Sequence, residues 1–124
     1  MSLHKQIINF NAAVTKEIDT IYRDIALELH RRIVNKTPID TGRAKANWNL
    51  SSGSPDTTVT DSTTPNSPNI GSPKAGVDEL WIANYLHYIY ALEFGHSSQA
   101  PSGMVVLSMQ EMPAWVQSKM KGKV

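Results

Sequence analysis

The first third of the chain alternates apolar and charged residues with the period of an α-helix. Its apolar residues are spaced by three or four positions, which places them on one helical face. They are Ile7, Phe10, Val14, Ile18, Ile21, Ile25, Leu29 and Ile33. Pro38 ends the pattern, because the residue before a proline is displaced from helical dihedral angles. We predict a helix over Leu3–Lys36, about 50 Å long, which either spans the domain or protrudes from it.

A short helix, a strand start and a long polar segment are predicted next. Asp40 or Thr41 is expected to cap a helix over Gly42–Ala46 by accepting a backbone N–H bond. Trp48 is expected near the start of a strand.

Residues 51–76 contain six Ser, five Thr, four Pro and three Gly. Such a segment buries too little apolar surface to offset its ordering entropy. We therefore predict that residues 53–76 form a flexible loop or an extended hairpin arm, with Val59 at its tip, that becomes ordered on assembly.

Order is predicted to return at Val77, with one strand over Val77–Asn84 and two further helices. The first helix is indicated by the helical spacing of Leu86, Ile89, Tyr90 and Phe94, followed by Gly95 as a C-terminal stop. Ser102 is expected to cap the last helix, and Pro113 to kink or break it. The apolar face of that helix is Val105, Met109, Met112 and Val116. Residues 119–124 are expected to fray.

These elements predict a single α+β domain over residues 1–124. A long N-terminal helix packs on a small, mainly antiparallel sheet built from about Asn47–Ser52, the loop region and Val77–Asn84. Short C-terminal helices flank it.

Composition narrows the functional class. The formal net charge of +1 gives no strong field toward nucleic acid. Cysteine is absent, which excludes a disulfide framework and a Cys nucleophile. No apolar run reaches the length of a membrane helix, and Met1–Phe10 lacks the pattern of a signal peptide. We expect no cofactor, no metal and no membrane partner.

The sequence contains no complete motif for a catalytic or metal-binding site. Gly95–Gln99 begins like the nucleophile elbow of a serine hydrolase, but lacks the closing glycine and follows a helix. The spacing of His87, Glu93 and His96 matches no helical zinc pattern. For Glu93 we favour a structural role, in which its carboxylate ties down a loop through backbone N–H groups or an arginine. We expect no catalytic residue.

Two surface clusters leave alternatives open. The basic residues near the first helix end either complement the helix dipole or face a polyanion, as in a DNA channel. They are Arg31, Arg32, Lys36, Arg43 and Lys45. The aromatic residues are interpreted as core packing rather than as base-stacking platforms. They are Trp48, Trp81, Tyr85, Tyr88 and Tyr90.

Two ordered motifs carry a resemblance to a known family. The first is TPIDTGR at 37–43, with Pro38, Asp40, Thr41 and Gly42, followed by Asn47 and Trp48. The second contains Asn84, Tyr88, Glu93, Gly95 and Pro101. From about residue 30 to 108 the chain resembles the tail-component family of tailed bacteriophages, which includes neck and tail-completion proteins. The long Ser/Thr/Pro loop departs from the usual family pattern.

The resemblance implies a structural virion protein of the head–tail junction, made in the host cytoplasm. It implies a homo-oligomeric ring, commonly a hexamer or dodecamer, that contacts connector and tail-tube proteins and surrounds DNA. A ring needs two different complementary surfaces on each subunit. We place one near Arg23, Glu28, Arg31 and Val59. The alternatives are a small nucleic-acid-binding or regulatory protein that uses the basic cluster and, third, an enzyme.

Overall fold

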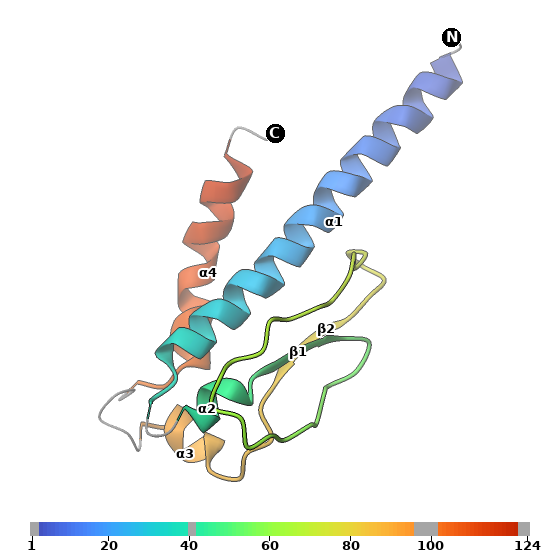
Figure 1. Ribbon diagram of the computed structural model, residues 1–124. Coiled ribbons are helices and arrows are strands. Elements are labelled where there is room, and N and C mark those ends of the chain that lie inside the picture. Colours follow the sequence, from blue (N-terminus) through green and yellow to red (C-terminus); the bar gives the residue numbers. More distant parts are fainter. Residues whose placement is uncertain (1–2, 40–41, 96–101, 122–124) are drawn as a thin grey trace.

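The computed structural model describes residues 3–39, 42–95 and 102–121 of the chain. It has the predicted α+β architecture, with a long first helix, a small sheet and a C-terminal helix (Figure 1). The elements in order are α1 (Leu3–Lys36), α2 (Arg43–Ala46), β1 (Asn49–Ser52), β2 (Leu80–Ala83), α3 (Ile89–Glu93) and α4 (Val105–Met120).

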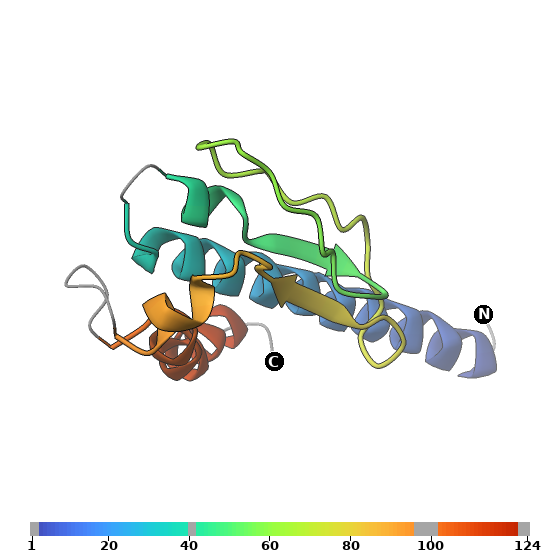
Figure 2. The ribbon, with the colours of Figure 1, turned by 90° about the horizontal axis from the view of Figure 1, so that it is seen from below.

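Helix α1 has the bounds that the apolar spacing predicted, and it both underlies the domain and protrudes from it. Its C-terminal half contacts α4, β1 and α2. Its first turns extend past the sheet, the loop and the other helices in both views (Figures 1 and 2). The predicted apolar face is buried at Ile33, which is 1% exposed, whereas Ile18 is 51% exposed. The change occurs because the sheet and α4 cover only the later turns of the helix.

The sheet is smaller than predicted. Strand β1 pairs with β2 antiparallel, with Leu50 opposite Ile82 and Ser51 opposite Trp81. Each strand has four residues. Among the described residues the loop region between them adds no third strand, so that part of the prediction is wrong. Its prolines remove backbone N–H donors that a ladder needs.

Two apolar clusters hold the domain together. The first joins α1 to the other helices through Ile33, Val34, Trp48, Ile89 and Met104. Beside it lies buried His30 of α1, whose Nε2 is 2.9 Å from the carbonyl oxygen of Trp48. Burial lowers the pKa of this histidine, although the bond to the carbonyl opposes the shift.

The second cluster joins α1 to the sheet and to the long loop. It consists of Ala26, Leu50 and Ile70, each 8% exposed. Ile70 is therefore an apolar anchor inside the segment that composition described as having almost none. A single residue of this kind has little weight in a segment average, yet it fixes the loop against the sheet.

Polar side chains of α1 hold the second half of the loop. The Tyr22 hydroxyl donates to the Asp78 carbonyl at 2.6 Å, and Arg23 Nε donates to the Gly71 carbonyl at 2.8 Å. Asp19 Oδ1 accepts the Ala75 N–H at 2.9 Å. The mixed-charge side of the helix is therefore partly a docking surface for its own loop.

The first half of the loop runs beside β1. Asn49 Nδ2 donates to the carbonyl oxygens of Asp56 and Thr58, at 3.2 and 2.9 Å. Val59 follows directly and is 45% exposed, but no strand flanks it, so it is not the tip of a hairpin. The flexibility predicted for 53–76 stays a prediction.

The C-terminal helices differ from the prediction in two details. Helix α4 runs through Pro113 without a break and continues to Met120, so Lys119 lies in the helix rather than in a frayed tail. Its buried residues are Ser108 and Met112, while Met109 of the predicted face is 57% exposed.

None of the helices in the described part of the chain has the length and apolarity to cross a membrane.

Candidate functional site

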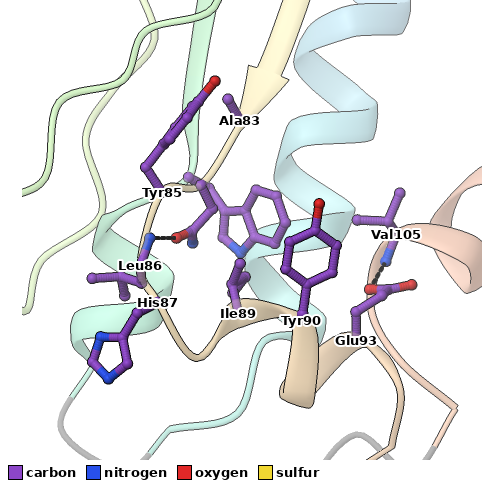
Figure 3. A pocket seen from close by; sticks show the side chains of 10 residues that line it. Ala83, Tyr85, Leu86, His87, Ile89, Tyr90, Glu93 and Val105 are labelled. Atoms are coloured by element: carbon purple, nitrogen blue, oxygen red, sulfur yellow. Dashed lines mark hydrogen bonds between the residues drawn. The ribbon is translucent and has the colours of Figure 1, made fainter.

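A groove of about 540 Å³ opens between the end of β2, α3 and the start of α4 (Figure 3). Its floor contains Trp48, Leu86 and Ile89, which are 8% exposed or less. Tyr85 and Tyr90 rise at its rim and are 50% and 74% exposed. The groove is therefore apolar at its base and aromatic at its edge.

The exposed aromatic residues correct one interpretation. Trp48 is in the core as predicted, and Tyr88 is half-buried. Trp81 of β2, Tyr90 of α3 and Tyr85 between these two elements are exposed. Tyr90 also stacks on Phe94, which is 73% exposed, with ring planes 8° apart. Exposed aromatic side chains that gather in this way are typical of interaction surfaces.

Glu93 has the structural role that the sequence suggested. Its Oε1 accepts the backbone N–H groups of Met104 at 2.9 Å and Val105 at 2.8 Å, and its Oε2 accepts that of Val106 at 3.2 Å. These donors form the first turn of α4, where a negative charge is stabilising. Glu93 therefore caps α4, and the cap that we expected from Ser102 is absent.

A glycine permits the close approach of α3 to the start of α4. Gly103 has φ +84°, and a Cβ there would lie 2.3 Å from the Glu93 carbonyl oxygen. Gly95, two residues after Glu93, has φ +85° and follows the end of α3, as its predicted role as a helix stop requires. Pro101 lies outside the described residues.

The first motif forms a closed corner between α1 and β1. Pro38 follows the end of α1, and Gly42 precedes α2 with φ +90°. Asn47 is fully buried; its Nδ2 donates to the carbonyls of Arg43 and Thr60, and its Oδ1 accepts the Thr60 N–H at 2.8 Å. Asp40 and Thr41, the expected caps, lie outside the described residues.

Asn84 joins the two motifs. Its Nδ2 donates to the Ala44 carbonyl of α2 at 3.0 Å, and its Oδ1 accepts the Leu86 N–H at 3.1 Å. It closes the end of β2 as expected and also attaches α2 to that end. Tyr88 stands at the start of α3, with its ring edge against His87. The motif residues thus act together to fix the corners of the fold.

Of the candidate reactive residues, His87 and Glu93 lie in the described part of the chain, and the structure does not bring them together. Figure 3 shows the His87 ring turned away from Glu93, and the Glu93 carboxylate directed at the Val105 N–H. No group of three His, Asp or Glu residues suited to a metal ion is present among the described residues. His96 and residues 96–99 of the elbow-like segment lie outside the described residues.

The basic cluster is largely paired with acidic side chains. Glu28 accepts from Arg31 Nε at 3.0 Å and from Arg32 Nε at 2.6 Å. Glu111 of α4 accepts from Arg32 Nη1 at 3.0 Å and from Lys36 Nζ at 2.7 Å.

Two more of the basic residues contact their own chain. Arg43 pairs with Asp61 at 3.3 Å, and Lys45 Nζ is 3.4 Å from the Asn35 carbonyl oxygen. The two pairs with Glu111 join α1 to α4, and the acidic partners of the cluster lower the positive charge available to a polyanion.

The four residues proposed for a subunit interface have different surroundings. Arg23 holds the Gly71 carbonyl, and Glu28 is occupied by two arginines. The Arg31 side chain is 56% exposed, and Val59 is 45% exposed. Only the latter two therefore present much surface to a partner.

Comparison of the chain with protein-family models, curated protein sequences and solved structures identified no match.

Proposed function

We propose that this chain is a structural subunit of a tailed-phage head–tail junction, a neck or tail-completion protein that assembles into a ring around the DNA channel. The observation that carries the proposal is the shape of the subunit. A compact body presents an exposed aromatic groove, and the first turns of a 34-residue helix extend beyond that body. A ring subunit needs two distinct surfaces of this kind, because each copy contacts two neighbours differently.

The chemistry of the motif residues agrees with a scaffold. The side chains of three motif residues form hydrogen bonds with backbone groups of their own chain. They are Asn47, Asn84 and Glu93. A general base needs a free lone pair within reach of a substrate proton, and the Glu93 oxygens are already engaged by three N–H groups. The motif therefore maintains corners of the fold rather than reactive groups.

The virion location and the ring of six or twelve copies come from the resemblance of the two motifs to the tail-component family. In this chain the two motifs lie together, because Asn84 of the second motif donates to the Ala44 carbonyl directly after the first. Connector and tail-tube proteins are the expected neighbours on the two faces of the ring.

A nonsense mutation in the encoding gene tests the proposal. Electron microscopy of bacterial cells in which the mutant phage has been induced should then show DNA-filled heads and separate tails. A plasmid copy of the gene should restore joined particles. A Glu93→Gln copy that still folds should also restore them, because Glu93 has no catalytic task. Normal joined particles without the chain would overturn the proposal.

A further inference from the structure

The apolar groove lies at the end of the molecule opposite to the free part of α1. Trp48 and Ile89 of its floor belong to the same apolar cluster as Ile33, near the C-terminal end of that helix. Ile18 lies fifteen residues earlier, or about 22 Å along the helix at ~1.5 Å per residue. Figures 1 and 2 show the remaining turns continuing away from the body. The helix therefore cannot place its own first half in its own groove.

The free part of the helix has an apolar stripe in its sequence. Positions 7, 10, 14 and 18 hold Ile, Phe, Val and Ile, at steps of three and four, so they share one face of α1. At the described end of this stripe Ile18 is 51% exposed, beside exposed Lys16 and Glu17. An amphipathic helix that presents anchors at i, i+3 and i+7 is the usual occupant of an apolar groove.

We propose that the first half of α1 of one subunit binds in the groove of the next, with its apolar stripe on Leu86 and Ile89 and under Tyr85 and Tyr90. The occupant is a second copy of this chain. The contact is head-to-tail, since a helix meets a groove and each copy offers one of each. This inference rests on the proposed ring and assigns its two surfaces.

The geometry favours a second copy over an unrelated partner. The stripe and the groove are both apolar, and both occur on every copy, at opposite ends of the molecule. A head-to-tail contact leaves one helix and one groove unfilled at the ends of any open chain of subunits. Closing the ring fills both, which gives a closed assembly an advantage over an open one.

Two substitutions separate the halves of the contact. Ile18→Glu places a charge on the helix stripe, and Tyr90→Glu places one at the groove rim. Both side chains are at least half exposed, so the folded subunit should tolerate either change. Val77→Glu is the matched control, because Val77 is 76% exposed in the loop and belongs to neither surface. Thermal melts of all three establish folding, and sedimentation with native mass spectrometry gives the assembly state.

Each of the two variants alone should need at least a tenfold higher concentration than wild type to self-associate, whereas Val77→Glu should assemble as wild type does. An equimolar mixture of the two variants should form a heterodimer that neither forms alone. In that dimer the intact helix of Tyr90→Glu lies in the intact groove of Ile18→Glu. A contact between like surfaces cannot produce this rescue.

The outcomes separate this inference from the proposed function. Wild-type rings together with unchanged assembly of both variants would overturn the helix-to-groove contact and leave the ring in place. Weakened variants that fail to form a mixed dimer would also overturn it. A wild-type chain that stays monomeric at every concentration would contradict the ring as well.

Discussion

The indole Nε1 of Trp48 donates a hydrogen bond to the Thr37 hydroxyl at a distance of 2.8 Å. Both side chains are buried, and the same hydroxyl donates to the Ile33 carbonyl at 2.7 Å. The bond joins the residue after α1 to the residue before β1, across the turn that carries the first sequence motif. Thr37 and Trp48 thus fix the direction in which the chain leaves the long helix.

Removing the Thr37 hydroxyl should destabilise the domain. Thr37→Val keeps the shape of the side chain but leaves the buried Trp48 N–H without an acceptor, at a cost of about 1–3 kcal/mol. Thr37→Ser retains the hydroxyl and serves as the control. Urea unfolding measures both, and equal stability of the two variants would show that the bond contributes little.

A side chain at Gly42 should be costly for two reasons. The residue has φ +90°, and a Cβ would lie 2.7 Å from the Thr63 carbonyl oxygen. Gly42→Val should lose at least about 1–3 kcal/mol from backbone strain alone. Gly53→Val is the matched control, since Gly53 has φ +95° and nothing within 4 Å. The midpoint of thermal unfolding should fall further for Gly42→Val than for the control. An equal fall would mean that the contact with Thr63 does not contribute to stability.

Neutralising Glu93 should weaken the start of α4. Glu93→Gln removes the negative charge that faces three backbone N–H groups, which should cost about 1–2 kcal/mol. Glu79→Gln removes the same charge from an exposed side chain and should be close to neutral. Amide hydrogen exchange should show faster exchange at 104–106 in the first variant only. Unchanged protection of these amides would show that the Glu93 charge does not stabilise the start of α4.

Acid should destabilise the chain through Glu28. Its hydrogen bonds from Arg31 and then Arg32 lower the pKa of the carboxyl from 4.5 to about 2, against an opposing effect of burial. The unfolded chain therefore binds this proton more readily. The stabilisation is complete above pH 4.5 and is lost as pH falls toward 2. Stability measured against pH should fall more steeply for wild type than for Glu28→Gln in this window, and parallel curves would contradict the assignment.

The sequence predicted the long elements and the corners well. The spacing from Ile7 to Ile33 defined α1, because a helix that packs on one side repeats its apolar residues with its own period. Pro38 and Gly95 marked helix ends by their backbone restrictions alone. The Glu93 contact was foreseen from the residue type and its place before Gly95, although its target, the first turn of α4, depends on tertiary structure.

The groove and the loop contacts could not be predicted in the same way. Tyr85 and Tyr90 lie in an apolar segment, and only the tertiary arrangement shows that no element covers them. Ile70 anchors the loop as one apolar residue among many polar ones. The pairing of Arg32 with Glu111 joins residues 79 positions apart, which no local pattern reveals.

The most direct test of the central claim is the mass of the assembled protein. Native mass spectrometry of the purified chain should be recorded across a range of concentrations, with and without the tail-tube protein of the same genome. A single closed species of six or twelve copies is the predicted result. Monomers or symmetric dimers under every condition would contradict the ring.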